Sequence, residues 1–372
     1  MEPIPVSTPS LNDHDIQAVA KTMAEGWISS EGPPVQEFEK AFAHLVQRRH
    51  GIAVGNGTAA LDIALEGLGI GPGDEVIIPS FTIISCLNQV LRSGATPVFV
   101  DAQRDTWNMD VSALKGLITP RTKAIIVVHI YGLPADIDQV VALAKEHDIA
   151  VIEDAAEAHG QQLDGAPLGS FGDVSTFSFY SNKLITTGEG GMVLTDDDRL
   201  EAKFRELRNL SFNPAQRFVH EDIGWNYRMT SMQAALGISQ LSRIDELLDY
   251  KKKVGQTYQE LLNGTPGISL PLPSYRGSEN VYWIFGIVLD PDSPHTASEM
   301  MNKLAAKGIG TRPFFYPLHQ QPVLSKFGFE PTPGLPNAEW LGKQGFYVPN
   351  GAGLSRTQQE YIAHTVQEAL VS

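Results

Sequence analysis

Residues 124–154 read AIIVVHIYGLPADIDQVVALAKEHDIAVIED, and this segment gives the strongest indication of the fold class. Its two ends, Ala124–His129 and Ala150–Glu153, are short runs of apolar and β-branched residues, which are typical of buried strands. Between them, Ile137–His147 carries apolar residues at the spacing of one helix face. A strand, a helix and a second strand in this order predict parallel strands joined by a right-handed crossover.

The same alternation continues on both sides of this stretch. Further strand-like runs are Ile52–Val54, Glu75–Ile78, Pro97–Val100, Val174–Phe179 and Gly191–Thr195. Thr58–Leu68 reads as a helix that follows the first of these runs. The last two runs are joined by residues 181–190, which leave no room for a crossover helix, so at least one strand is expected to be antiparallel. We therefore predict an α/β fold with a large, mixed and mostly parallel sheet.

The remaining sequence predicts more helices and a second, smaller unit. Helical patterns cover Asp13–Glu25 (capped near Asn12), Ala297–Lys307 and Thr357–Leu370, Met232 to about Leu262 reads as long helices, and a new unit begins around Val281–Leu289. Prolines interrupt the helical pattern between residues 266 and 273. These features predict a large domain over residues 1–250 and a small C-terminal α/β domain over residues 251–372.

Charge and composition exclude several classes of protein. The 372 residues include 28 basic and 43 acidic side chains, which give a net charge of −15. This acidic surplus argues against binding to nucleic acid or to an anionic membrane, because either needs a basic face. No apolar run reaches about 18 residues, and the N-terminus lacks the pattern of a secretory signal. With a single cysteine, Cys86, the sequence predicts a cytoplasmic globular protein without disulfide bonds.

The first candidate site is the turn Gly55-Asn56-Gly57-Thr58, between a predicted strand and a predicted helix. Glycines let the backbone approach a ligand, and the free N–H groups of a helix N-terminus bind phosphate. The spacing also matches a dinucleotide fingerprint, but that site needs an acidic residue at the end of the next strand, where the sequence has Ile78-Pro79-Ser80. A tight turn without a ligand is the other alternative.

The second candidate site is Asp154, at the carboxyl end of a predicted buried strand, where open α/β sheets place their ligands. A carboxylate there can keep a pyridine nitrogen protonated, which makes the ring an electron sink. The alternative is that Asp154 caps a following helix. We interpret the nearby His159 as a core histidine rather than a catalytic group.

The third candidate site is Lys183, between a predicted strand and the glycine-rich run Gly188–Gly191. A lysine that forms a Schiff base needs partial desolvation, which lowers its pKa. A lone lysine in a loop is ordinarily a solvated charge. Here, however, the phosphate turn, Asp154 and Lys183 occur in order on one sheet, and together they predict a site for a pyridine cofactor that bears a phosphate.

Two further motifs, Gly26–Pro33 (GWISSEGP) and Gly224–Thr230 (GWNYRMT), accompany these sites. With them, the chain resembles the sugar aminotransferases of the DegT/DnrJ/EryC1/StrS family from about residue 4 to the C-terminus. The resemblance implies the type I fold of pyridoxal-phosphate (PLP) enzymes, which is the aspartate aminotransferase-like fold. It also implies an obligate homodimer with active sites at the interface, L-glutamate as the amino donor, and a cofactor that cycles between PLP and its aminated form, PMP.

The resemblance also assigns the cofactor contacts. They are Gly57, Thr58, Ala59, Ile83, Asp154, Glu157, Ser178 and Lys183, with Asn226 from the second subunit. Lys183 would be the catalytic residue and form the Schiff base, and Asp154 would face the pyridine nitrogen. Glu157 would bind the ring hydroxyl, where many relatives carry glutamine. Ile83 stands where many members place an aromatic ring, so stacking on the cofactor is lost. No metal is expected.

The substrate is indicated by weaker signals. Segments Phe177–Phe179, Thr186–Val193 and Thr311–His319 resemble family members that aminate C4 of GDP-4-keto-6-deoxymannose, which gives GDP-perosamine for surface polysaccharide such as O-antigen. Candidate substrate contacts are His220, Arg228, Phe315, Tyr316 and His319, because cations and aromatic rings suit a diphosphate and a sugar face. Packing at an interface is the alternative for each. Other C4 aminotransferases share these motifs, so a UDP-, dTDP- or CMP-linked sugar is the alternative substrate.

Three other functions fit parts of the sequence. A PLP-dependent sugar dehydratase of this family would carry histidine in place of Lys183. An NAD-linked oxidoreductase lacks its acidic residue, as described above. A non-catalytic sensor of nucleotide sugars would not need Asp154, Glu157 and Lys183 together.

Overall fold

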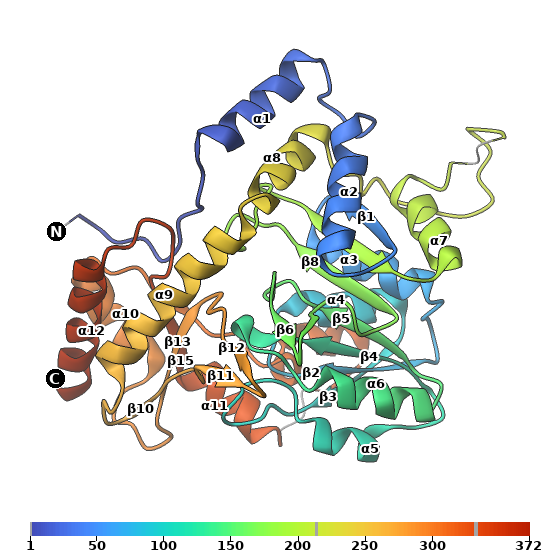
Figure 1. Cartoon of the computed structure of the whole chain (residues 1–372). Coiled ribbons are helices and arrows are strands. Elements are labelled where there is room, and N and C mark those ends of the chain that lie inside the picture. The colour runs from blue at the N-terminus through green and yellow to red at the C-terminus, as the bar shows by residue number, and fades with distance from the viewer. Residues whose placement is uncertain (1, 213–214, 331–333) are drawn as a thin grey trace.

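A seven-stranded mixed sheet forms the centre of the molecule (Figure 1). The computed structural model describes residues 2–212, 215–330 and 334–372. In spatial order the strands are β1 (His50–Val54), β9 (Gly191–Thr195), β8 (Val174–Ser178), β5 (Ala150–Asp154), β4 (Thr122–Val128), β2 (Glu75–Pro79) and β3 (Thr96–Val100). The strands from β8 to β3 are parallel, whereas β9 is antiparallel to both β8 and β1. The predicted mostly parallel sheet and its antiparallel strand are therefore confirmed.

Helices cover both faces of this sheet because its strands are apolar on both faces. Along β4, Ile125 and Val127 pack in the core formed with α2 and α6, while Ala124 and Ile126 pack in the core formed with α3 and α4. The helices are α1 (Asp13–Ala24), α2 (Pro33–Leu45), α3 (Gly57–Gly67), α4 (Ile84–Ser93), α5 (Leu114–Leu117), α6 (Ile137–Glu146), α7 (Asp198–Arg208), α8 (Ser231–Leu241) and α9 (Ile244–Leu262). The predicted cap at Asn12 is confirmed, since its side chain and that of Asp15 form a capping box.

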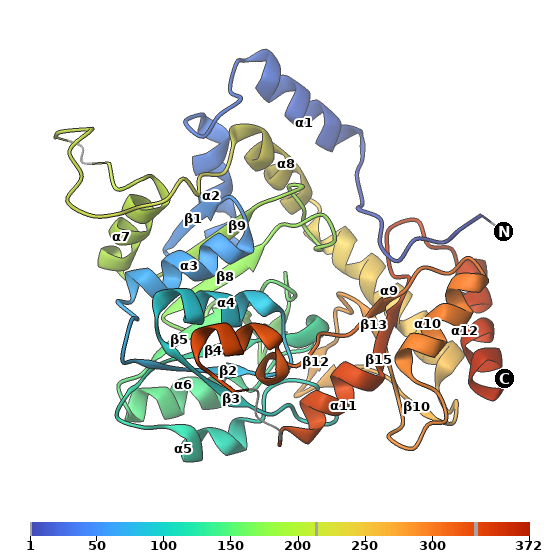
Figure 2. The same ribbon diagram turned by 180° about the vertical axis from the view of Figure 1, so that it is seen from behind.

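A second, four-stranded antiparallel sheet lies beside the first unit, and α9 crosses from one to the other (Figures 1 and 2). Its strands, in order, are β10 (Ile268–Ser269), β13 (Phe285–Leu289), β15 (Gly345–Val348) and β14 (Arg312–Pro313). It is accompanied by α10 (Ala297–Ala306), α11 (Pro336–Gln344), α12 (Arg356–Val371) and the hairpin β11–β12 (Ser274–Tyr275, Ser278–Glu279). Another hairpin, β6–β7 (Gln162–Leu163, Ala166–Pro167), follows β5 of the main sheet. Short 3₁₀ helices are at Val111–Ala113, Ile130–Gly132, Leu318–Gln320 and Pro322–Phe327.

The long helices predicted over Met232–Leu262 are α8 and α9, and the chain breaks between them from Leu241 to Ile244. The new unit predicted to begin around Val281–Leu289 contains β13, which starts at Phe285. Tyr282, with φ 47°, lies outside the extended region and precedes this strand.

The boundary predicted at residue 250 falls inside α9. Chain segments also cross the predicted division in both directions. Ile4 bridges Ile309 and packs in the core of the second sheet, whereas Leu318 and Leu341 pack in the core of the main sheet. The division of the chain into residues 1–250 and 251–372 stays a prediction.

Within the described residues, no helix is both long and apolar enough to cross a membrane. No group of three or more histidine, cysteine or acidic side chains in the same ranges is arranged to hold a metal ion.

Candidate active site

A cavity of about 360 Å³ opens at the carboxyl ends of β5 and β8, beside the N-terminus of α3. Its lining includes Gly57, Thr58, Ile83, Asp154, Glu157, Ser178, Lys183 and Phe315, all of them predicted site residues. The carboxyl edge of parallel strands is the position that α/β sheets use for ligands. The structure therefore brings together most of the cofactor site that the sequence predicts.

Lys183 follows β8 in a turn, where its backbone N–H donates to Tyr180 O at 2.9 Å. Its side chain is only 11% exposed, and its Nζ lies 3.9 Å from Glu157 Oε1. Burial lowers the pKa of the amine, and the charges of Glu157 and Asp154 oppose this shift in part. A lowered pKa provides the neutral amine that can attack a carbonyl carbon.

Asp154 is the last residue of β5 and is only 3% exposed. Its Oδ1 accepts a hydrogen bond from the backbone N–H of Ala156 at 3.1 Å, and its Oδ2 lies 3.6 Å from the Cys86 thiol. Burial raises the pKa of Asp154, while the Ala156 hydrogen bond and the Lys183 charge oppose the rise. No helix begins between residues 155 and 173, so the interpretation of Asp154 as a helix cap is wrong.

Glu157 is held by the backbone of Tyr131, whose N–H donates to Glu157 Oε2 at 2.9 Å. Burial raises the pKa of Glu157 to about 7, against the opposing charge of Lys183. Tyr131 has φ 57°, a left-handed conformation that is unfavourable for a bulky side chain. Such strain is found where a site requires a fixed backbone, and here it directs an N–H group to Glu157.

The other end of the cavity fits a phosphate. Asn56 caps α3 by accepting from the N–H of Ala59 at 2.8 Å, and the helix N-terminus offers partial positive charge to an anion. Gly57 faces Ser178 so closely that an added Cβ would lie 2.9 Å from Ser178 Cβ. Thr58 Oγ1 lies 2.9 Å from Ser85 Oγ, and both hydroxyl groups line the cavity. Because Ala59 N–H is used in the cap, that backbone group is not free for a ligand.

Six predicted contacts lie outside this cavity: Ala59, described above, and Asn226, His220, Arg228, Tyr316 and His319. Asn226 and His220 are exposed, and Arg228 donates to the side-chain oxygens of Asn226 and Asn209. Tyr316 is 54% exposed and Phe315, its neighbour, lines the cavity. An exposed Asn226 is compatible with a role in a partner subunit.

His319 is placed in the protein interior instead. It is fully buried, and its ring nitrogens lie 2.5 Å from Ser80 Oγ and 3.1 Å from Glu339 Oε1. With both nitrogens engaged and no place in the cavity lining, the ring links the end of β2 to α11 rather than contacting a ligand in this cavity.

His159 is also interior, as the sequence interpretation expected. Its ring packs against Phe42, Phe177 and Phe179. Burial lowers its pKa to about 3, so the ring is neutral at physiological pH.

The cavity also contains residues that sequence reasoning missed. Tyr131, Asn182, Trp283 and Tyr347 line it, and the Lys183 Nζ lies 3.7 Å from the centroid of the Trp283 ring. The only sequence signal for Tyr131 is its position just after β4, at the same sheet edge as Asp154. Trp283 and Tyr347 come from the second sheet unit, and no local pattern links them to Lys183.

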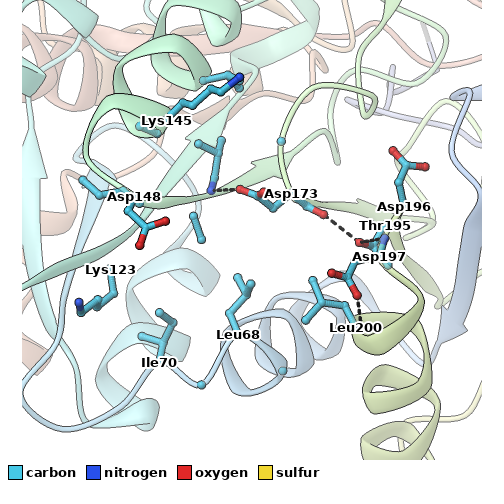
Figure 3. Close-up of a pocket in the computed structure, with 18 of the residues that line it drawn as sticks. Leu68, Ile70, Lys123, Lys145, Asp148, Asp173, Thr195, Asp196, Asp197 and Leu200 are labelled. Carbon is cyan, nitrogen blue, oxygen red and sulfur yellow. Dashed lines mark hydrogen bonds between the residues drawn. The ribbon is translucent and has the colours of Figure 1, made fainter.

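A larger hollow of about 1120 Å³ lies at the opposite edge of the main sheet (Figure 3). Two of its acidic side chains are engaged in local structure: Asp173 Oδ2 accepts from Val151 N at 2.8 Å, and Asp197 caps α7. Since it lies at the amino ends of the parallel strands, away from Lys183, we assign no chemistry to it.

Comparison with known proteins supports the assignment of this cavity as an aminotransferase active site. The sequence model of the DegT/DnrJ/EryC1/StrS aminotransferase family matches residues 9–367. GDP-perosamine synthase of Caulobacter vibrioides is 42% identical over 99% of this chain and 98% of its own, and that of Escherichia coli O157:H7 is 40% identical over 99% of each. The putative sugar aminotransferase Spr1654 of Streptococcus pneumoniae was solved in PLP and PMP forms, and both superpose on this chain with a TM-score of 0.92 at 28% identity. The superposition with the PLP form covers 99% of this chain and 99% of Spr1654. The resemblance seen in the sequence is thus confirmed, and this chain belongs to the DegT/DnrJ/EryC1/StrS aminotransferase family.

Proposed function

We propose that this aminotransferase uses PLP to transfer the amino group of L-glutamate to C4 of GDP-4-keto-6-deoxymannose, which gives GDP-perosamine for a surface polysaccharide. The chemistry rests on one observation, the convergence of Lys183, Asp154 and Glu157 in a cavity beside a helix N-terminus. The substrate assignment rests on the 42% and 40% identity to two GDP-perosamine synthases over nearly the whole chain.

The buried single cysteine, Cys86, fits a reducing compartment, and we propose a cytoplasmic location.

The residues present fit the cofactor at each of its polar groups. Gly57, Thr58 and Ser178 would hold the phosphate, and Asp154 would hold a proton on the pyridine nitrogen. Glu157, whose pKa lies about 7, can share a proton with the ring hydroxyl. When bound, PLP would supply a carbonyl carbon that carries the amino group from one substrate to the next and a ring that accepts the electron pair of the reacting carbon. Lys183 Nζ anchors the cofactor and moves the proton at the reacting carbon.

The aromatic side chains give the cavity an apolar wall. Tyr131 follows β4 of the main sheet, whereas Trp283, Phe315 and Tyr347 come from the second sheet unit, and all four line the cavity with Lys183. They exclude water from the amine, and their faces suit the apolar face of a sugar ring. We propose that this wall binds the sugar, while His220 and Arg228 contact the substrate from the partner subunit.

We further propose a homodimer that shares its active sites. Trp27, Ile28, Phe218 and Ile223 are large apolar side chains that are exposed in the single chain. Such side chains are covered at the interface of a two-fold dimer, where each patch meets its own copy. Asn226 lies in the same segment as Phe218 and Ile223, and it would complete the phosphate site of the partner.

A complementation experiment tests the shared site. Lys183→Ala and Asn226→Ala homodimers are each expected to have little activity. Mixed and refolded together, they should recover about a quarter of wild-type activity, because random pairing makes half of the dimers mixed and each mixed dimer has one intact site. Lack of recovery, with mixed dimers verified by two affinity tags, would refute the contribution of Asn226 across the interface.

The amino acceptor is tested with a panel of substrates. Purified enzyme with glutamate is offered GDP-4-keto-6-deoxymannose and the UDP- and dTDP-linked 4-keto-6-deoxy sugars, and products are measured by mass spectrometry. The GDP-linked ketone should give the largest kcat/KM. Preference for another nucleotide would reject the perosamine assignment in favour of the second candidate, an aminotransferase for a different nucleotide-linked keto sugar, and would leave the PLP chemistry intact.

A further inference from the structure

A second lysine, Lys251 of α9, is partly buried and lines a small cavity together with Lys183. Its Nζ donates to the backbone carbonyl oxygens of Trp283 and Asn350, each at 2.8 Å. Desolvation lowers its pKa to about 7. A partly buried amine that is held by two carbonyl oxygens, rather than by an acidic side chain, calls for a reason beyond surface charge.

Trp283 connects this lysine to the active site. Its carbonyl oxygen is bound by Lys251, its indole Nε1 donates to the carbonyl oxygen of Asn182 at 2.9 Å, and its ring lies on the amine of Lys183. Three contacts therefore lead from α9 to the cofactor lysine. Two of these contacts hold Trp283 in place, one at its backbone carbonyl oxygen and the other at its indole nitrogen.

The other partner of Lys251 strengthens the same junction. Asn350 gives its carbonyl oxygen to Lys251, and its side-chain amide donates to the carbonyl oxygen of Tyr282 at 2.9 Å. A small cavity of about 40 Å³ lies between Lys251, Asn350 and the segment Ser181–Leu184. Lys251 thus joins α9 to the segments before β13 and after β15, at the point where both approach the Lys183 turn.

We propose that Lys251 is a positioning residue: by fixing the backbone of Trp283, it keeps the indole ring packed on the amine of Lys183. This proposal rests on the proposed role of Lys183 as the cofactor lysine. The indole face attracts a cation, but it also excludes water, and desolvation of a buried lysine is the larger of the two effects. The net result is the lowered pKa of Lys183, which Asp154 and Glu157 oppose. If the ring moves away, water reaches Nζ and the amine becomes harder to deprotonate.

The test uses the cofactor-free enzyme and its covalent reaction with added PLP, followed by visible absorption as a function of pH. In Lys251→Met, the pH midpoint of the reaction rate should rise by about one unit, which lowers the rate below the midpoint by about tenfold. Lys253→Met is the matched control, because Lys253 is an exposed lysine of the same helix. Its profile should equal that of the wild type. An unchanged profile in Lys251→Met would overturn the proposal.

A double variant separates positioning from a general loss of packing. Trp283→Leu removes the ring and should shift the midpoint in the same direction. Adding Lys251→Met to Trp283→Leu should then change nothing further, whereas additive shifts would show that Lys251 does not act through Trp283. Lys251→Arg keeps the donors and should restore most of the wild-type profile. If Lys251→Met does not fold, an unshifted Trp283→Leu overturns the proposal by itself. Absence of covalent PLP in the wild type would instead reject the proposed function.

Discussion

Lys183→Ala is expected to abolish covalent PLP binding and to reduce transamination more than any other single change. Without Nζ, the anchor and the group that moves the proton are both lost, and general acid–base catalysis alone contributes about 10²–10⁴-fold. The visible absorption band of the lysine-linked cofactor should be missing from the purified variant. Formation of 2-oxoglutarate from glutamate, measured in the same preparation, should fall to near background.

The control for this variant is Lys253→Ala, which removes an exposed lysine from α9. Both proteins should keep the wild-type circular dichroism spectrum, which separates lost chemistry from lost structure. A persistent lysine-linked band in Lys183→Ala would mean that another amine carries the cofactor. Of the remaining lysines in the described ranges, Lys251 is the one with a strongly lowered pKa and would be the next to test.

Asp154→Asn is expected to cause the second largest loss. Asparagine keeps the size of the side chain and cannot hold a positive charge on the pyridine nitrogen, so the electron sink is weakened while the cofactor still binds. Removal of one electrostatic contribution of this kind typically lowers kcat by about 10²–10³-fold. The variant should therefore retain its visible band, and the loss should appear in single-turnover conversion of glutamate.

Asp173→Asn is the matched control, because Asp173 is exposed at the opposite edge of the same sheet, just before β8. It should leave single-turnover rates at the wild-type value. An Asp154→Asn enzyme with undiminished turnover would show that the pyridine nitrogen is not paired with this carboxylate. A variant that loses the cofactor altogether would indicate that Asp154 acts mainly in binding.

The main sheet could be predicted from the sequence because its signals are local. Each strand is a short apolar run, each crossover helix has its own periodicity, and the absence of a helix between β8 and β9 indicates the antiparallel strand. The second sheet was harder to predict. Its strands other than β13 and β15 are only two residues long, which is too short to show an alternating pattern in the sequence.

The candidate site also contains residues that could be predicted from the sequence and residues that could not. Gly57, Asp154 and Lys183 follow strands of one sheet, so their shared edge could be derived from the order of the elements. The prediction for His319 rested on the chemistry of its side chain, which suits a diphosphate or a sugar face, and not on its orientation. Adjacent residues in an irregular segment can face opposite directions, and His319 turns to Ser80 and Glu339 while Phe315 turns to the cavity.

The α/β order of the chain and the chemical groups of the cofactor site can be read from the sequence, because short motifs carry them and their spacing follows from strands and helix ends. The surroundings of the Lys183 amine depend on tertiary packing. Trp283 lies 101 positions from its hydrogen-bond partner Asn182, and Lys251 reaches Trp283 from a separate helix. The pKa of a lysine depends on the water and charges around it, and those are set by packing between segments that no local pattern connects.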